Sequence, residues 1–183
     1  IAAWIWCARN GVSKIAAADT IALGVPWGLM LGRLANFINA ELWGRPTDVP
    51  WAMKFPTMCR NTVLQGCEKA GEWFYTGAEL TRHPSQLYQA ALEGAVIGLL
   101  LLFLAFSRGA LKTRGLITGV FIAGYATARF IVEHFRQADA QFVTPDNPFG
   151  HVVLGITMGQ LLSLPMVLAG VLIILWARRN RPV

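Results

Sequence analysis

The stretch GVFIAGYATARFIVEHFR, residues 119–136, sets two arginines and a glutamate within an otherwise apolar run. Its polar side chains recur in steps of four, four and three, at Tyr125, Arg129, Glu133 and Arg136. On a helix these steps keep them on one stripe. Charged side chains in lipid are costly, normally face a protein interior or a wet cavity, and mark functional sites by default. The stretch therefore predicts a membrane helix that carries a site for an anionic group.

The composition supports the same class of protein. The chain has 183 residues, of which 55% are hydrophobic and only 14% charged, and its mean hydropathy is +0.47. A soluble domain would carry about a quarter charged residues. The net charge of +6 by itself suits nucleic acid, but the basic residues stand beside apolar runs, where they set topology and contact anionic lipid. We therefore predict an all-α, polytopic helical membrane protein that binds no nucleic acid.

Apolar segments divide the chain into expected membrane spans. Residues 1–8 are too short to cross a bilayer, which takes about 20 residues, and they lack the features of a signal peptide. We interpret them as the end of a span that begins upstream, so that residues 1–183 form part of a single membrane domain. The expected spans are about 16–38, 87–106, 116–135 and 152–177.

Three groups of basic residues gather at every second membrane face along the chain, so that they all lie on one side of the membrane. The positive-inside rule puts the basic loops and the C-terminus in the cytoplasm. It puts residues 39–86 and 137–151 on the opposite side, which in a bacterial cell would be the periplasm. The basic residues concerned are Arg9, Lys14, Arg108, Lys112, Arg114, Arg178, Arg179 and Arg181.

Residues 39–86 predict a folded extramembrane subdomain on the periplasmic side, because their aromatic residues are too many for a disordered linker. Cys59 and Cys67 lie in this segment, where the compartment is oxidising. A disulfide and two free thiols both stay open, since spacing alone says nothing about geometry. No Cys and His spacing in the chain is typical of a zinc site.

The motif GRLANFINAELWGR, residues 32–45, closes the first expected span. If the helix continued, Arg33, Glu41 and Gly44 would lie on one side of it. Arg33 could simply snorkel to lipid headgroups, but Asn36 close by favours a buried site. Arg129 could likewise serve only a structural ion pair, which would leave the other arginines unexplained. Arginine-bearing helix ends on the outer side predict a phosphate-binding cleft, because guanidinium groups bind phosphate in a bidentate way.

The motif RHPSQLYQ, residues 82–89, precedes the next expected span. Pro84 favours the start of a helix there, which places His83 at the outer interface. A capping or interfacial role for His83 and a proton-transferring role both fit this position.

Together these motifs resemble the prolipoprotein diacylglyceryl transferase family of the bacterial inner membrane. The resemblance is carried by GRLANFINAELWGR (32–45), HPSQLY (83–88) and YATARFIVEHFRQAD (125–139), in matching order and spacing. It implies transfer of the diacylglyceryl group of phosphatidylglycerol onto the lipobox cysteine of preprolipoproteins, the first step of lipoprotein maturation. The implied partners are phosphatidylglycerol, preprolipoprotein signal peptides and the lipid bilayer, and no metal or redox cofactor is implied.

The resemblance also implies roles for individual residues. Arg129, Arg33 and His83 are the catalytic candidates, and Arg33 also binds the lipid headgroup. The remaining residues would shape and orient the substrate site: Asn36, Glu41, Gly44, Arg45, Tyr125, Glu133 and Arg136.

The chain departs from the family pattern at several positions. Ala35 and Ala40 stand where glycine is usual, and Gln89 stands where a glutamate is usual. A His-Gly-Gly element of an earlier helix, thought to include the thiol-activating base, is missing. We therefore expect this chain alone to be inactive.

Two other classes of function remain alternatives. An anionic-lipid transporter or flippase could use Arg33 and Arg129 to bind its cargo at a broken helix, but it should carry inverted repeats, and no repeat is visible. A structural membrane subunit would leave the arginine stripe without a purpose.

Overall fold

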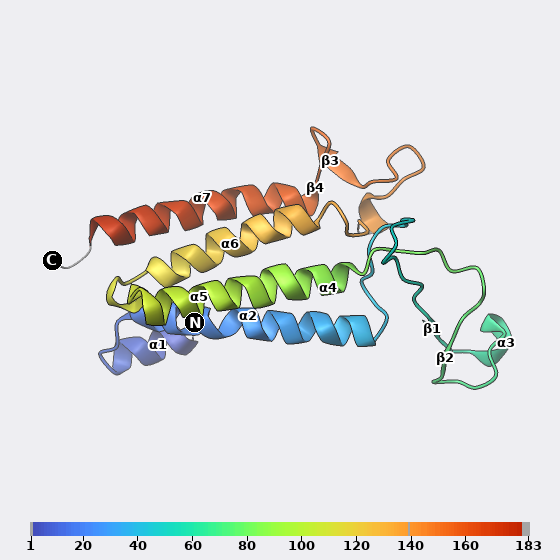
Figure 1. Cartoon of the computed structure of the whole chain (residues 1–183), viewed down its shortest axis with the longest axis horizontal. Coiled ribbons are helices and arrows are strands. Elements are labelled where there is room, and N and C mark those ends of the chain that lie inside the picture. The colour runs from blue at the N-terminus through green and yellow to red at the C-terminus, as the bar shows by residue number, and fades with distance from the viewer. Residues whose placement is uncertain (1, 139, 181–183) are drawn as a thin grey trace.

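The computed structural model describes residues 2–138 and 140–180. Long helices lie side by side and form one bundle, with a loosely wound segment projecting from one end (Figure 1). Helix α6 packs most extensively against α7, and α2 packs against residues 90–96, which follow α4. In chain order the helices are α1 (Ala2–Arg9), α2 (Lys14–Ile38), α3 (Thr62–Gln65), α4 (Ser85–Gln89), α5 (Ile97–Ser107), α6 (Leu116–Val132) and α7 (Met158–Arg179).

The shorter elements join and extend these helices. A π-helix, Ala90–Val96, connects α4 and α5 without a break, and turns of 3-10 helix span Ala110–Lys112 and Ala140–Phe142. Two antiparallel pairs of strands complete the described structure: β1 (Thr57–Met58) with β2 (Trp73–Phe74), and β3 (His151–Val153) with β4 (Ile156–Thr157).

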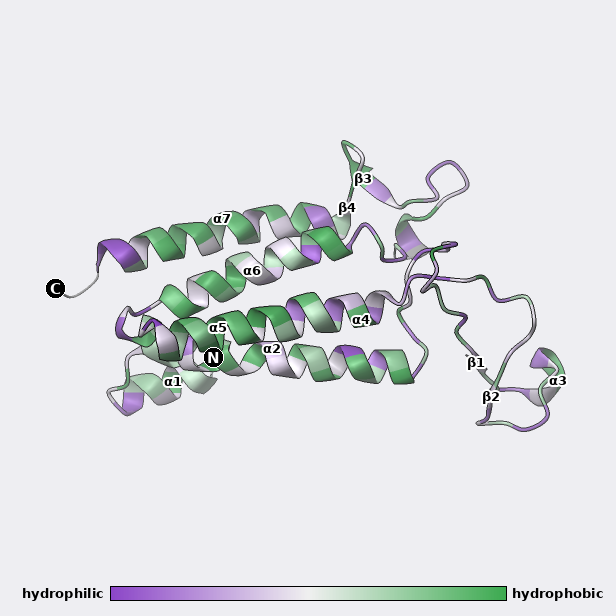
Figure 2. Cartoon of the chain, in the orientation of Figure 1, coloured by the Kyte–Doolittle hydropathy of each residue, from purple (hydrophilic) through white to green (hydrophobic). Residues whose placement is uncertain are grey.

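The predicted fold class, an all-α polytopic membrane protein, is confirmed. In the part of the chain that the structure describes, three helices are long and apolar enough to cross a membrane: Lys14–Ile38, Ser85–Ser107 and Met158–Arg179. Helix α6 is apolar too, but has only 17 residues. Apolar residues run along the bundle, and hydrophilic ones gather toward its ends and in the connecting segments (Figure 2).

Two of the expected span limits were wrong. Helix α7 begins at Met158, not near residue 152, because the preceding residues form the β3–β4 hairpin. The helix start is set by a capping box, in which the side chains of Thr157 and Gln160 bond each other's backbone N–H. Helix α6 ends at Val132 and not near residue 135, because the chain turns there and Arg136 forms an isolated β-bridge with Gly44.

The basic connections lie at one end of the bundle. The α1–α2 turn, the α5–α6 loop and the end of α7 meet there, whereas residues 39–84 and the β3–β4 hairpin lie at the other end (Figure 1). This arrangement agrees with the alternation of basic residues along the sequence, although which end faces the cytoplasm stays a prediction. Ile1, Asp139 and Arg181 belong to the expected motifs but fall outside the described residues.

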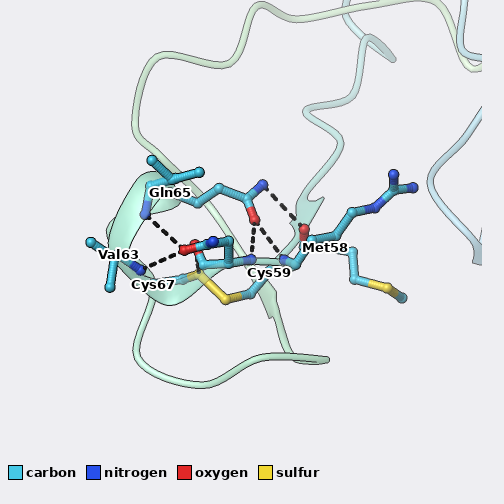
Figure 3. Close-up of a disulfide and its surroundings, with 8 residues drawn as sticks. Met58, Cys59, Val63, Gln65 and Cys67 are labelled. Atoms are coloured by element: carbon cyan, nitrogen blue, oxygen red, sulfur yellow. Dashed lines mark hydrogen bonds between the residues drawn. A yellow bond between two sulfur atoms is a disulfide. The ribbon is translucent and has the colours of Figure 1, made fainter.

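The projecting segment is held together by a small apolar nucleus and a disulfide. Trp43 stacks on Phe55, and Phe37 meets the same ring edge-on. Cys59 and Cys67, whose state the sequence left open, form a disulfide beside α3 (Figure 3). Gln65 of α3 accepts hydrogen bonds from the backbone N–H groups of residues 60 and 61, so the cross-link closes a locally hydrogen-bonded loop.

A buried aspartate joins α2 to the start of α6. The carboxylate of Asp19 is 1% exposed and accepts hydrogen bonds from the Gly115 N–H (2.6 Å), the Thr118 N–H (2.8 Å) and the Thr118 hydroxyl (2.7 Å). The first turn of any helix leaves N–H groups without partners. Here the capping acceptor comes from another helix, so Asp19 fixes α6 against α2 at the end of the bundle opposite the arginines.

Asp19→Asn should therefore destabilise the bundle. The amide keeps one acceptor but turns N–H donors toward the N–H donors of α6, and the loss of a buried charged acceptor costs about 1–3 kcal/mol. Thermal unfolding in detergent measures the effect, with the exposed Asp48→Asn as the matched control. An unchanged melting temperature for Asp19→Asn would contradict the assigned capping role.

Candidate active site

The α6 stripe forms a buried ion-pair system, as the sequence predicts. Arg129 Nη2 lies 2.9 Å from Glu133 Oε2, and Arg136 Nη1 lies 3.8 Å from the same oxygen. The Glu133 side chain is only 6% exposed and the two arginines 16% each. Glu133 therefore holds two guanidinium groups at the end of α6.

The start of α7 fixes Glu133 from the other side. The Thr157 hydroxyl donates a hydrogen bond to Glu133 Oε1 at 3.2 Å, and the N–H of Gln160 bonds that hydroxyl at 3.4 Å. A Cβ on Gly159 would lie 2.6–2.8 Å from the atoms of the Glu133 carboxylate group, so only glycine leaves room for it. A carboxylate at a helix N-terminus is also stabilised by the helix dipole.

A second buried carboxylate faces the arginine of α2. Arg33 Nη2 lies 3.7 Å from Glu93 Oε2, and the Glu93 side chain is completely buried in the π-helix. The charges of Arg129 and Arg136 also act on Glu93. Sequence analysis missed Glu93, although one signal was available. It continues the spacing of Gln86 and Gln89 within an apolar run, and the structure buries all three.

These charged groups form one set, which we call the arginine cluster: Arg33, Glu93, Arg129, Glu133 and Arg136. Three guanidinium groups against two carboxylates leave one formal positive charge. Tyr125 lies close enough to interact with the charges of Glu93, Arg129 and Arg33, so the structure brings this predicted residue to the same place. An anion suits such a cluster electrostatically.

Several deep polar atoms of the cluster and its surroundings have no hydrogen-bond partner within the described chain. They are Arg129 Nη1, both carboxylate oxygens of Glu93, Gln86 Oε1 and Gln89 Nε2. Buried polar atoms normally have a partner. The cluster therefore offers both donors and acceptors to a polar ligand.

Gly44 and Arg45 tie the projecting segment to the end of α6, and their predicted part in the substrate site stays a prediction. The Gly44 N–H donates to the His83 carbonyl and the Arg45 N–H to the Phe135 carbonyl, each at 2.9 Å. The Arg45 guanidinium donates to the Arg136 carbonyl at 2.8 Å. A Cβ on Gly44 would lie 2.5–2.7 Å from atoms of residues 83 and 135. Arg45 therefore contacts the end of α6 through its backbone N–H group and also through its side chain, whereas the Gly44 N–H bonds residue 83.

His83 lies beside an apolar cavity of about 410 Å³. Its Nδ1 is 3.2 Å from the Tyr88 hydroxyl, which also accepts a hydrogen bond from Trp51 Nε1 at 2.7 Å. Burial lowers the pKa of His83, which favours the neutral imidazole. Whether His83 transfers a proton stays a prediction. The cavity is lined by Trp51, His83, Tyr88, Ala91, Leu92, Val132 and Phe135.

Helix α2 does not continue past residue 38, so Arg33, Glu41 and Gly44 do not share one helical face. Helix α2 ends at Ile38, and the chain reverses through left-handed conformations at Ala40 (φ 48°) and Leu42 (φ 55°). Glu41 is therefore exposed in a turn, where its carbonyl, not its carboxylate, accepts a hydrogen bond from Gln86 Nε2 at 2.7 Å. Asn36 is half-buried on α2, within one turn of Arg33. Residue 40, where glycine is usual in the family, is thus a position whose backbone favours glycine.

Fold and site together define a helical membrane protein with an arginine–carboxylate cluster buried near one end of its bundle. The chain belongs to the prolipoprotein diacylglyceryl transferase family, whose model matches residues 1–176. A phosphatidylglycerol–prolipoprotein diacylglyceryl transferase from Ruegeria pomeroyi is 56% identical over 182 residues, and proteins of the same name from Roseobacter denitrificans and Cereibacter sphaeroides are 51% and 50% identical.

These alignments cover most of this chain but only part of its relatives. They include 97% of the chain and 58% of the proteins from Ruegeria and Roseobacter, and 98% and 60% for the protein from Cereibacter. The chain thus spans somewhat more than half the length of these curated relatives.

Gly159→Ala should destabilise the protein by crowding Glu133. An added methyl group in a well-packed site lowers the free energy of unfolding by about 1–3 kcal/mol. Here the methyl group would push the Glu133 carboxylate away from both of its arginines. Gly28→Ala is the matched control, because a Cβ at that helical position meets open space. Thermal unfolding in detergent should show a lower melting temperature for Gly159→Ala only. Equal melting temperatures for the two variants would argue against the tight fit.

Proposed function

We propose that the protein to which this chain belongs transfers the diacylglyceryl group of phosphatidylglycerol to the lipobox cysteine of preprolipoproteins. The observation that carries the proposal is the buried arginine cluster, in a chain of this family. The names of its relatives state the same lipid and the same protein substrate.

Arg33 and Arg129 are proposed to bind the phosphate of the lipid headgroup. They come from different helices, α2 and α6, and each is oriented by a buried carboxylate. A guanidinium group grips phosphate oxygens in a planar, bidentate way, which a flexible ammonium cannot reproduce. Transfer from a phospholipid and transport of an anionic lipid would both use these two arginines, whereas a purely structural subunit would use neither for a ligand.

The proposed reaction is a substitution at a glycerol carbon. The cysteine thiolate forms the new S–C bond while the C–O bond to the phosphate breaks, and glycerol phosphate leaves with the electron pair. Arginines in a water-poor site stabilise the charge that develops on the leaving group. The thiol proton must pass to a base, because the thiol itself is a poor nucleophile. His83, a neutral imidazole next to Tyr88, is the candidate within this chain.

The proposed orientation puts the cluster on the periplasmic side of the inner membrane. The basic connections at the opposite end of the bundle support it, since such loops stay in the cytoplasm. Signal peptides of preprolipoproteins would then reach the site from the outer face.

A C-terminal fusion of the full-length protein tests this orientation. Green fluorescent protein should fluoresce there and alkaline phosphatase should stay inactive, because the end of α7 lies with the basic loops. The reverse pattern would place the arginine cluster on the cytoplasmic side and would contradict the proposed route of the substrate.

Activity is tested on the full-length protein in nanodiscs with phosphatidylglycerol and a lipobox peptide. Mass spectrometry should find a diacylglyceryl adduct on the cysteine, and none on a peptide with Cys→Ser. Folded protein that binds phosphatidylglycerol but forms no adduct would favour an anionic-lipid transporter or flippase.

Arg129→Lys should lower the transfer rate by at least about a hundredfold while leaving expression unchanged, because transition-state charge stabilisation of this kind is typically worth that much. Arg60→Lys, on the exposed projecting segment, is the matched control and should transfer like the wild type. Full activity of Arg129→Lys would exclude the proposed role of its guanidinium.

A further inference from the structure

We propose that Glu93 is a positioning residue of the arginine cluster. Its carboxylate holds Arg33 in place by electrostatic attraction and offsets part of the positive charge that faces the lipid phosphate. The catalytic consequence of this inference rests on the proposed function, whereas the electrostatic arrangement does not.

The burial of Glu93 requires a compensating charge. The side chain is 0% exposed, and neither of its carboxylate oxygens has a hydrogen-bond partner in the described chain. An isolated carboxylate in an apolar interior is strongly disfavoured. The guanidinium of Arg33 at 3.7 Å is the nearest compensation, and the charges of Arg129 and Arg136 add to it.

The backbone around Glu93 places its carboxylate next to Arg33. Glu93 lies in the π-helix between α4 and α5, and such insertions are frequently found at functional sites. The next residue, Gly94, lets α2 approach very closely, since a Cβ there would lie 2.5 Å from the Met30 Cβ and 2.9 Å from the Met30 Cα. Met30 and Arg33 are three residues apart on α2 and share a face. The contact at Gly94 thus brings Arg33 against Glu93.

The separation within the pair indicates positioning and not a closed salt bridge. At 3.7 Å, Arg33 and Glu93 exceed hydrogen-bond distance. The attraction therefore orients the Arg33 guanidinium, but Arg33 donates no hydrogen bond to Glu93. Glu133 plays the equivalent part for Arg129, but at 2.9 Å and with a second anchor at Thr157.

Glu93→Gln in the full-length protein tests the inference, because it removes the charge and keeps the shape. The cluster then gains one positive charge. Phosphatidylglycerol should bind at least as tightly, while glycerol phosphate leaves more slowly and Arg33 is no longer oriented. We expect turnover at saturating lipid to fall by about tenfold, which lies within the usual coupling energy between residues in contact. The lipid concentration that gives half-maximal turnover should not rise. Glu68→Gln, an exposed glutamate, is the matched control.

Glu93→Asp separates charge from shape. The shorter carboxylate keeps the charge, so turnover should recover to about threefold below the wild type. Turnover of Glu93→Gln within about twofold of the wild type would overturn the proposal, as would Glu93→Asp being as slow as Glu93→Gln. If Glu93→Gln does not fold, turnover of Glu93→Asp about tenfold or more below the wild type would overturn the proposal, because this variant keeps the charge.

Lipid retention distinguishes this inference from the proposed function. Native mass spectrometry of the detergent-solubilised protein compares bound phosphatidylglycerol in the wild type, Glu93→Gln and Arg33→Gln. We expect Glu93→Gln to retain the lipid and Arg33→Gln to lose it. A wild type that retains lipid but forms no adduct refutes the transferase and leaves the role of Glu93 supported. Loss of lipid from Glu93→Gln would refute that role.

Discussion

The rest of the structure depends on the pairing of buried charges. A guanidinium within an apolar bundle needs a nearby carboxylate, because desolvation of an unpaired ion costs more than the bundle can offset. Arg129 obtains its partner one turn along its own helix, at 2.9 Å. Arg33 obtains its partner from the π-helix of a neighbouring segment. The Arg33–Glu93 pair thereby joins α2 to the π-helix, and the hydrogen bond from Thr157 joins Glu133 to the start of α7, so the site forms where these segments meet.

Both ends of the bundle are built on the same principle. At one end Asp19 of α2 caps the start of α6, and at the other Glu133 of α6 lies against the start of α7. Asp19 accepts from backbone N–H groups at the start of α6, whereas Glu133 accepts from the Thr157 hydroxyl that caps α7. The projecting segment then covers the arginine end through the backbone bonds of Gly44 and Arg45. Polar contacts thus fix the two ends of the bundle, while buried apolar side chains such as Leu101 and Ile117 pack between the helices.

Much of the site could be predicted from residue spacing within a single element. The stripe through Tyr125, Arg129 and Glu133 follows from helical periodicity, and the structure keeps it intact. Spacing failed where the chain left the helix. A helix continued past residue 38 would have put Glu41 on the side of Arg33, but the turn at Ala40 carries its side chain to the surface. Local patterns do not say where a polar segment reverses direction.

The sequence by itself determined the membrane class, the placement of basic residues at every second connection and the arginines within apolar helices. Each of these follows from hydropathy, charge and helical period, which can be read along the chain. Only the tertiary structure decided which carboxylate pairs with which arginine. Glu93 lies 60 residues from Arg33 in the sequence, and their contact depends on the close approach of Gly94 to Met30. The start of α7 and the Cys59–Cys67 bond were decided in the same way. Such contacts depend on packing between segments, and the periodicity within either segment does not predict them.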